Sequence, residues 1–312
     1  MKKSMMALLL AISLLATFAV AEAESPTTGL PTSKAYKPIV CQMDNEPGAR
    51  PQCGIASADV IYEAELYDGG YTRYTCVFND EIPEKIEAVR SARIFHIDLY
   101  KEWGGIFTCF GFQYDEGTNA SIYAEQNVQV LLNGNAGLAD FYRDNARKAP
   151  NNVVFELAKR YNTIEEEFSE RSPFVFSDAP TQGSETVHEF EICYRKSYDA
   201  SFVWDDEKKV YLRFYNGEPQ LDGYTGEQLS FSNVIVQNAD YSWYDGNGDR
   251  PVVELTGANT CEYFIGGKHF SGYWVRNKVD ENTTYYDEDG NVVQFARGKT
   301  FVQIVDSLAV SY

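Results

Sequence analysis

The sequence predicts an α+β protein in which a mixed α/β N-terminal domain precedes a mostly antiparallel β C-terminal domain. Three observations predict this class. Between residues 37 and 161, segments in which apolar and polar residues alternate, as in strands, are followed by segments in which apolar residues have helical spacing. Over residues 185–312, short apolar runs follow one another every ~8–12 residues, with turn residues between them. Residues 162–184 carry prolines and three consecutive glutamates, so we interpret them as a linker.

Length, composition and charge narrow the possible functions. The chain has 312 residues, and Asp and Glu (46) outnumber Lys and Arg (27), which gives a net charge of −19. Nucleic-acid binding requires basic residues that neutralise phosphates, so this charge excludes nucleic acid as a partner and disfavours an anionic membrane surface. With 44% hydrophobic and 23% charged residues, the chain has the composition of a globular protein.

The N-terminus has the organisation of a signal peptide, which we assign to residues 1–23. Two lysines precede an apolar run over residues 5–20, and alanines then occur with the A-x-A spacing of a cleavage site after Ala21 or Ala23. The apolar run is shorter than the ~20 residues of a spanning helix. We therefore favour cleavage over the alternative, an uncleaved membrane anchor.

The segment after the signal peptide, residues 24–36, is rich in Ser, Thr, Pro and Gly and predicts a flexible leader. The first cysteine is Cys41, so no lipobox cysteine is present to carry a lipid. We expect the mature protein to be exported and soluble, either extracellular or in the periplasm and cell envelope. No stable membrane insertion is expected after cleavage.

Strands come first in the N-terminal domain, residues 37–161. Apolar and polar residues alternate through residues 58–66, and a glycine-rich turn leads into an apolar run over residues 72–78. Two such segments joined by a Gly-rich turn predict a β-hairpin. Further strand-like runs occupy residues 38–43 and 106–112.

Helices are predicted where the apolar spacing changes to three or four residues. Three apolar side chains at intervals of four fall on one face of a helix over residues 92–103, which two glycines end. The same spacing predicts helices near residues 121–132 and 152–161. Helices that alternate with strands give this domain its mixed α/β character.

The C-terminal domain, residues 185–312, is predicted to consist of β-strands. Turn dipeptides such as Asn216-Gly217 and Asp289-Gly290 separate the apolar runs. Short strands at this spacing predict a sandwich or an open, barrel-like sheet. The candidate strands are residues 187–194, 209–215, 231–237, 252–256, 262–265, 270–275, 291–295 and 300–305.

The six cysteines have no C-x-x-C spacing of a zinc ribbon. Three of them, Cys41, Cys76 and Cys109, lie within apolar, strand-like runs. Free cysteine packs well in a core, and a chain of this length does not need disulfides to fold. We therefore favour buried free thiols, while the even number of cysteines in an exported protein leaves disulfide pairing open.

The motifs indicate no cofactor and no metal. The three histidines lack the spacing of metal ligands. Residues 245–249 begin like a calcium loop, but Arg250 and Thr256 occupy the places of its Gly and Glu, which favours a β-turn. The G-x-S-x-G sequence of a nucleophile elbow is absent from the chain.

A cluster of arginines is the most informative candidate site. The segment Arg90-Ser91-Ala92-Arg93 lies where a helix is predicted to begin. Guanidinium groups beside a helix N-terminus suit a carboxylate or phosphate ligand, and the alternative is a structural network of Arg–carboxylate pairs. The candidate ligand-binding residues are Asp44, Asn45, Arg50, Glu63, Arg73, Arg90, Ser91 and Arg93.

We divide this cluster by role. Glu63 and Arg73 lie on the two strands of the predicted hairpin. Opposite charges that face each other on neighbouring strands stabilise the pair, so we predict that these two residues have a structural role. Arg90 and Arg93 flank the predicted start of the helix, and we predict that they face the ligand.

Several short motifs occur in a set order along the chain. They are Ala49-Arg50-Pro51-Gln52, Ala58-Asp59-Val60-Ile61-Tyr62-Glu63, Gly69-Gly70-Tyr71-Thr72-Arg73, Val89-Arg90-Ser91-Ala92-Arg93 and Gly272-Tyr273-Trp274. This set resembles the signature of the YerB-like family of bacterial exported proteins, often lipoproteins, whose N- and C-terminal domains have no assigned function. The resemblance covers nearly all of residues 37–306. It implies a two-domain α+β protein in the envelope or outside the cell, and it implies no reaction.

The chain departs from the family pattern at three places. The lipoprotein cysteine is missing, and Cys109-Phe110 and Asn151 occupy positions where the pattern has histidine. A site that used those histidines in the family is altered in this chain.

Together these observations predict a non-catalytic, exported binding or interaction protein of the cell envelope. Its partner is expected to be a small anionic or glycan-type ligand, or another envelope protein. The alternative is a hydrolase that acts on cell-wall or extracellular polysaccharide through paired carboxylates, Glu63 with Asp44 or Asp98. The many tyrosines, and the tryptophans of the C-terminal domain, fit either a sugar-binding surface or strand packing.

Overall fold

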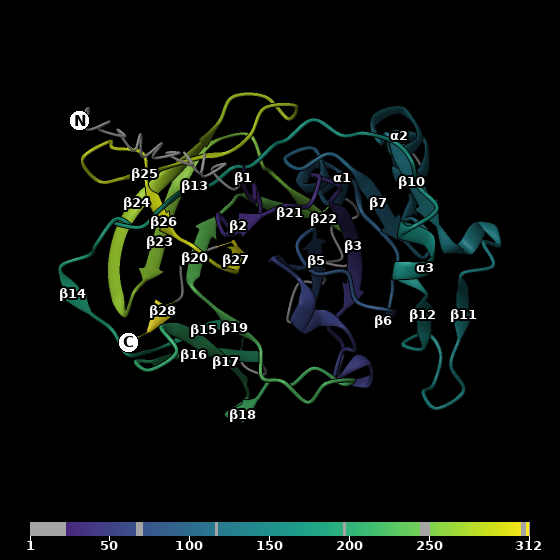
Figure 1. The fold of residues 1–312 in the computed structure, drawn as a ribbon, viewed down its shortest axis with the longest axis horizontal. Helices are drawn as coiled ribbons and strands as arrows, with labels where there is room; N and C mark the ends of the chain where they lie inside the picture. The colour runs from purple at the N-terminus through teal and green to yellow at the C-terminus, as the bar shows by residue number, and fades with distance from the viewer. Residues whose placement is uncertain are drawn as a thin grey trace, which may run out of the picture.

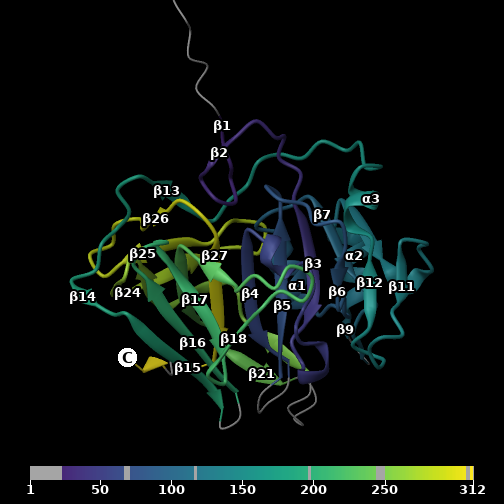
Figure 2. The same ribbon diagram turned by 60° about the horizontal axis from the view of Figure 1, so that its bottom comes forward.

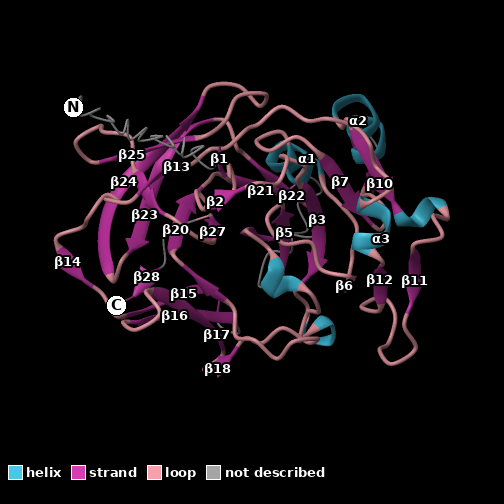
Figure 3. Cartoon of the chain, in the orientation of Figure 1, coloured by secondary structure: helices cyan, strands magenta, loops and turns pink. Residues whose placement is uncertain are grey.

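The computed structural model describes residues 23–66, 71–115, 118–195, 198–243, 250–306 and 310–311. Strands greatly exceed helices among these residues, so the protein is mainly β. Figure 3 shows the few short helices beside an extensive array of strands. The predicted α+β class is therefore too rich in helix, although the two-part layout is retained.

One eleven-stranded sheet runs through both halves of the chain (Figure 1). The N-terminal half contributes β3 (Ile39–Asp44), β4 (Val60–Glu65), β5 (Thr72–Phe78), β7 (Ile106–Cys109) and β10 (Val130–Asn133). The C-terminal half contributes β14 (Glu185–Thr186), β20 (Asn233–Asn238), β23 (Gly257–Ile265), β24 (Lys268–Arg276), β25 (Thr284–Asp287) and β27 (Thr300–Val305).

The strand order shows how the two halves are joined. The order is β10-β7-β3-β5-β4-β27-β20-β23-β24-β14, and β25 also pairs with β24. β4 and β5 are antiparallel neighbours, which confirms the predicted hairpin. The sheet passes from one half of the chain to the other where β4 and β27 pair in parallel, with Val60 opposite Thr300. Backbone hydrogen bonds therefore connect the two halves directly.

A second sheet of six antiparallel strands belongs to the C-terminal half. It contains β15 (Glu189–Arg195), β16 (Tyr198–Asp205), β17 (Val210–Tyr215), β18 (Glu218–Pro219), β19 (Ser230–Phe231) and β28 (Val310–Ser311). Figure 1 shows β15, β16 and β17 below β20 and β27, and Figure 2 shows them from another side. Aromatic contacts such as Phe202 with Phe301, whose ring centroids are 5.5 Å apart, pack this sheet on the first one.

The described residues form three α-helices and three single 3₁₀ turns. The helices are α1 (Ile94–Tyr100), α2 (Ala120–Asn127) and α3 (Leu157–Tyr161), and the 3₁₀ turns are Pro47–Ala49, Ile55–Ser57 and Gly134–Ala136. α1 confirms the helix predicted over residues 92–103, and its apolar face is buried.

The other two predicted helices are shorter than expected because strands replace part of each. The helix predicted over residues 121–132 ends at Asn127, and β10 then pairs in parallel with β7. The helix predicted over residues 152–161 begins only with α3, since β12 (Val153–Phe155) pairs with β6 (Ile86–Glu87) and β11 (Phe141–Arg143). Branched and aromatic side chains favour strand in both places.

Successive residues of the central strands pack on opposite faces of the first sheet, as the pleat requires. Val40 and Val302 lie in one apolar cluster with the side chains of α1. Ile39 and Phe301 lie in a second cluster with aromatic residues of the six-stranded sheet. Because both faces are covered, every residue of β3, β4, β5 and β27 is buried. Polar side chains on these strands need partners inside the protein.

Four pairs of short strands complete the fold. They are β1 (Ala23–Glu24) with β2 (Pro31–Thr32), β8 (Tyr114–Asp115) with β9 (Thr118–Asn119), β13 (Val175–Ser177) with β26 (Gln294–Ala296), and β21 (Tyr241–Trp243) with β22 (Pro251–Val253). β13 lies within the predicted linker, residues 162–184, so that segment adds a strand to the C-terminal half. The predicted signal peptide, apart from Ala23, and residues 245–249 lie outside the described residues.

Part of the predicted flexible leader, residues 24–36, contacts the body of the protein. Ser25 and Thr27 are buried. Thr27 Oγ1 donates a hydrogen bond to Asp59 (2.8 Å), and Ser25 Oγ donates one to Asp80 (2.6 Å). The hydroxyl groups of Ser25 and Thr27 thus satisfy two acidic side chains of the body.

Five of the six cysteines are buried and free, as predicted. They are Cys41, Cys53, Cys76, Cys109 and Cys261. Cys41 and Cys76 lie opposite each other on β3 and β5, in the core of the sheet. Burial raises the pKa of both thiols well above the ordinary value, so they behave as small apolar side chains.

A buried histidine predicts a dependence of stability on pH. His269 of β24 contacts Glu185 of β14 through Nδ1 (3.0 Å) and Glu262 of β23 through Nε2 (2.7 Å). Burial opposes the charged form, but the two carboxylates outweigh it, and the pKa of His269 is raised. A raised folded-state pKa stabilises the protein below the unfolded value of 6.5, and this contribution is lost as pH rises through the folded value.

We therefore expect the free energy of unfolding to fall as the pH rises from about 6.5 through the raised pKa of His269. The variant His269→Gln should lack this decrease, and His188→Gln should keep it because the His188 side chain is 59% exposed. Urea denaturation at a series of pH values measures the effect. Equal pH slopes for wild type and His269→Gln would show that this cluster does not titrate.

Candidate functional site

The predicted ligand-binding residues meet in one network at the ends of β3 and β4. Asp44, the last residue of β3, has no exposed surface. It forms an ion pair with Arg90 (Nε to Oδ2, 2.8 Å) and accepts a hydrogen bond from Asn151 Nδ2 (2.7 Å). Arg73 Nη2 lies 3.9 Å from the other carboxylate oxygen. Asp44 is therefore the common partner of two of the predicted arginines.

Asn45 extends the network from Arg50 to Glu63. Arg50 Nε donates to Asn45 Oδ1 (3.0 Å), and Asn45 Nδ2 donates to Glu63 Oε1 (2.9 Å). The Arg50 guanidinium also lies 3.5 Å from the centroid of the Tyr215 ring, which is a favourable cation–π geometry. This contact joins the N-terminal half to the six-stranded sheet.

Ser91 connects Arg73 to Arg93. Its carbonyl oxygen accepts a hydrogen bond from Arg73 Nη1 (2.6 Å), and its hydroxyl oxygen accepts one from Arg93 Nη1 (3.0 Å). All eight predicted residues are thus brought together, as expected from their closeness in the sequence. Most of their polar groups, however, are directed at one another.

The predicted pairing of Glu63 with Arg73 is wrong. Glu63 lies opposite Tyr74 across the hairpin, and Arg73 lies opposite Ala64. Directly opposed residues share a face and successive residues alternate, so Glu63 and Arg73 point to opposite faces of the sheet. The partner of Glu63 is Arg213 of β17, with Nη2 and Oε2 2.6 Å apart and neither side chain exposed.

The polypeptide surrounds Glu63 with further donors. Thr72 Oγ1 (2.6 Å) and Gln303 Nε2 (3.1 Å) donate to it in addition to Asn45 and Arg213. These hydrogen bonds and the ion pair with Arg213 occupy the Glu63 carboxylate and make it part of the structure. Asp44 and Glu63 therefore cannot contact a polysaccharide from their positions, and the predicted hydrolytic pair Glu63 and Asp44 is not accessible.

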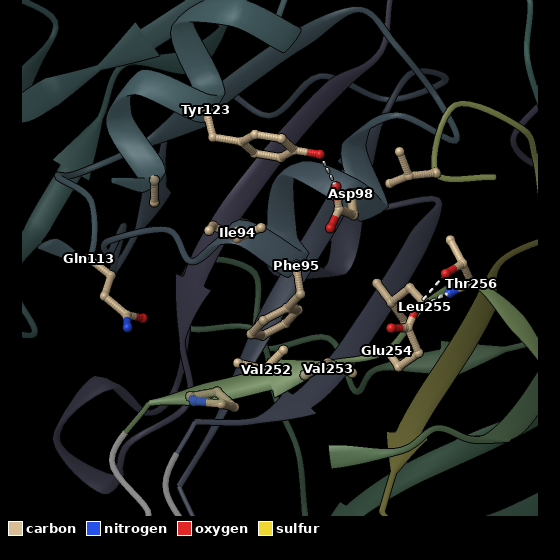
Figure 4. Close-up of a pocket in the computed structure, with 13 residues that line it drawn as sticks. Ile94, Phe95, Asp98, Gln113, Tyr123, Val252, Val253, Glu254, Leu255 and Thr256 are labelled. Carbon is tan, nitrogen blue, oxygen red and sulfur yellow. Dashed lines mark hydrogen bonds between the residues drawn. The ribbon is translucent and has the colours of Figure 1, made fainter. Parts of the chain in front are cut away.

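A pocket of about 420 Å³ lies outside this network, between the two halves of the chain (Figure 4). Its walls are formed by α1, α2, residues 251–256 and Val279. Figure 4 shows Phe95 of α1 above Val252 of β22, with Tyr123 of α2 at the top of the view and Gln113 at the left. Tertiary contact between α1 and β22 brings these distant segments together.

The pocket combines apolar walls with two carboxylates. Asp98 accepts a hydrogen bond from Tyr123 Oη (2.7 Å), and burial raises the pKa of Asp98 above its ordinary value against the effect of this bond. Glu254 is exposed and accepts a hydrogen bond from the backbone N–H of Thr256 (2.9 Å). Apolar contact surface with a few polar groups is the usual chemistry of a small-molecule site.

Sequence reasoning found only one residue of this pocket. Asp98 is one of the candidate carboxylates, whereas residues 252–256 are predicted only as a strand. The signal was missing because the two walls come from distant parts of the chain. The two walls come into contact through the β4–β27 pairing and the packing of α1 on β22. Neither contact produces a recognisable pattern in the local sequence.

The positions where the family pattern has histidine take structural roles. Cys109 is buried, with the pKa of its thiol raised by burial, and Asn151 donates to Asp44. Within the described ranges, no three His, Cys, Asp or Glu residues are grouped so that they could hold a metal ion. None of the helices in those ranges is long and apolar enough to cross a membrane.

Comparison with known proteins agrees with this architecture. Residues 27–172 match the model of the N-terminal domain of the DUF3048 proteins of unknown function, and residues 190–302 match that of the C-terminal domain. The chain is 25% identical over 296 residues to the Bacillus subtilis protein named "Putative lipoprotein YerB", covering 91% of this chain and 87% of the relative.

A solved structure shows the same fold. The crystal structure of YerB from Bacillus subtilis superposes with a TM-score of 0.80 at 24% sequence identity, over 93% of this chain and all of that one. The two domain models follow each other along the chain and together match most of it. The chain therefore belongs to the DUF3048 family, whose members include YerB-like proteins.

Proposed function

We propose that this chain is a non-catalytic binding protein of the cell envelope, exported by its N-terminal signal, and that it binds a glycan-derived ligand in the pocket beside α1. Two features support the location. The N-terminus has the lysines, apolar run and Ala-x-Ala spacing of a signal peptide. The relative from Bacillus subtilis carries the name of a lipoprotein.

The residues that line the pocket are the reason for proposing a glycan-derived ligand. A sugar ring has apolar C–H faces and hydroxyl groups that donate hydrogen bonds. Phe95, Val253 and Leu255 offer apolar contact, and Asp98 and Glu254 offer carboxylate acceptors. The volume of about 420 Å³ lies within the range of ligand pockets, ~300–1,000 Å³. The two carboxylates would repel an anionic group, so the neutral part of the ligand belongs here.

A blocking substitution tests this assignment. Val252 is 46% exposed and lines the pocket, so Val252→Trp should fill the pocket without disturbing the core. We expect the variant to bind cell-wall oligosaccharides at least ~10-fold more weakly than wild type in isothermal titration calorimetry, which corresponds to about 1.4 kcal/mol.

The matched control is Val292→Trp, because Val292 is 40% exposed and does not line the pocket. It should bind like wild type. Equal affinities for Val252→Trp and wild type would exclude the pocket as the binding site. Absence of binding by wild type across neutral and acidic oligosaccharides would exclude the proposed function.

One observation supports a second candidate, a glycoside hydrolase. Asp98 has a raised pKa and Glu254 lies in the same pocket, and glycosidases use one protonated and one charged carboxyl group. Asp98→Asn separates the two functions. A binding protein should release no reducing sugar ends from peptidoglycan or polysaccharide, whereas a hydrolase would release them in the wild type and lose nearly all activity in Asp98→Asn.

A further inference from the structure

A second pocket of about 410 Å³ lies next to the first and differs from it in chemistry. Its lining includes two basic residues, Lys101 and Arg171, and three amide residues, Gln126, Asn127 and Gln129. We call it the polar pocket and the first one the apolar pocket. In a chain with a net charge of −19, two cations at one cavity are a distinctive feature.

The two pockets lie end to end along the same helices. The first residues of α1, such as Phe95, line the apolar pocket, and its last turn, with Tyr100 and Lys101, lines the polar pocket. α2 also lines both pockets, with Tyr123 in the apolar pocket and Gln126 in the polar pocket. Val279 lines the apolar pocket, and the next residue, Asp280, lines the polar pocket.

A short chain of side chains forms the boundary between the pockets. Asp98 accepts from Tyr123 Oη, and Lys101 Nζ donates to the same hydroxyl oxygen (3.0 Å). On its other side Lys101 forms an ion pair with Asp280 (3.1 Å). The Lys101 side chain is 7% exposed and that of Asp280 is 78% exposed. The cation of this ion pair is therefore buried, and its counter-ion is exposed to solvent.

Arg171 adds a second positive charge to the polar pocket. Its Nε and Nη2 donate to Asn282 Oδ1, and Nη2 also donates to the carbonyl oxygen of Asp280 (2.6 Å). No carboxylate of a described residue lies within 4 Å of this guanidinium. An arginine held in place by neutral acceptors keeps its charge available for an anion.

We infer that the polar pocket is a subsite for an anionic group, carboxylate or phosphate, of the same ligand whose neutral sugar part occupies the apolar pocket. The inference rests on the proposed function and specifies its ligand as an acidic oligosaccharide or sugar phosphate. The anion takes the place of Asp280 beside Lys101 and contacts Arg171. The amides of Gln126 and Asn127 supply additional donors.

Isothermal titration of the full chain with matched probes tests the inference. Cellobiouronate and cellobiose differ only in that one sugar carries a carboxylate in place of a hydroxymethyl group, and glucose 6-phosphate and glucose form the corresponding phosphate pair. We expect one charged member to bind at least ~10-fold more tightly than its neutral partner, and the pair that shows this difference identifies the anion. Because charge drives the difference, it should decrease as salt is raised.

A charge-introducing variant locates the effect. Gln126 is exposed, so Gln126→Glu adds a negative charge to the polar pocket without altering the core. It should weaken binding of the acid by about tenfold and leave the neutral partner unchanged. Gln182→Glu is the control, because it adds the same charge at an exposed position outside both pockets.

The outcomes separate this inference from the proposed function. Equal affinities for the charged and neutral members, or an unchanged affinity in Gln126→Glu, would overturn the anionic subsite and leave a neutral-sugar site in place. Absence of binding by all four probes would overturn both. Weaker binding of both members in Val252→Trp, together with selective loss of the acid in Gln126→Glu, is the result expected from two linked subsites.

Discussion

Replacing Arg213 with alanine is expected to lower the free energy of unfolding by about 3–5 kcal/mol, because it leaves the carboxylate of Glu63 buried without its counter-charge. Both side chains have no exposed surface, and their charged atoms lie 2.6 Å apart. Arg213 also donates to Tyr74 Oη (3.2 Å), so its removal breaks a second contact between the two sheets. Denaturation with urea measures the loss.

A double-mutant cycle identifies the source of this loss. Removal of Glu63 as well should recover part of the stability, since the unpaired charge is then gone. Lys278→Ala provides the surface control, because its ion pair with Glu281 is exposed and should contribute less than about 1 kcal/mol. A coupling energy near zero for Glu63 and Arg213 would show that the pair does not join the sheets.

The second large effect is expected at Asp44. Asp44→Ala removes the carboxylate shared by Arg90 and Arg73 and the acceptor of Asn151. We expect the free energy of unfolding to fall by about 3–5 kcal/mol. Arg73 is only 1% exposed, so water cannot replace the carboxylate that its guanidinium loses. Thermal and chemical denaturation of the purified variant measure it.

Arg90→Ala distinguishes a structural cluster from a ligand site. If Arg90 supports Asp44, the variant should be less stable than wild type and should bind oligosaccharides normally. If Arg90 faces a ligand, as the sequence predicts, stability should hold or rise while affinity falls. Asp289→Ala is the control, because Asp289 is exposed and its loss should change stability by less than about 1 kcal/mol.

Local patterns predicted many of the elements of the fold. The hairpin of β4 and β5 and the helix α1 were predicted correctly because alternation and helical spacing are properties of neighbouring residues. The division of the region 121–133 between α2 and β10 was missed. There, parallel pairing with β7 overrides a helical pattern, and that partner strand cannot be read from the local sequence.

The arrangement of strands in the central sheet depends on distant pairings. β4 lies near the start of the chain and β27 near its end, and their parallel pairing makes one sheet of two halves. The sequence predicts two successive domains, but no local pattern indicates that β4 and β27 pair with each other. The hydroxyl-rich leader illustrates the same limit, because its partners Asp59 and Asp80 lie elsewhere in the sequence.

The candidate site shows the same contrast between near and distant residues. Asp44 and Arg90 were identified together because both belong to one cluster in the sequence, and the structure places them in contact. The partner of Glu63 was assigned wrongly because Arg213 comes from the other half of the chain. The pockets were missed for the same reason, since residues 251–256 and Asp280 reach α1 only through the fold.

The most direct measurement is hydrogen–deuterium exchange of the full chain with and without a binding oligosaccharide. Binding in the two pockets should slow exchange in residues 94–101, 120–127 and 251–256, and should leave residues 44–50 unchanged. Protection confined to residues 44–50 and 90–93, with none in residues 251–256, would contradict the pocket assignment and return the ligand to the arginine cluster.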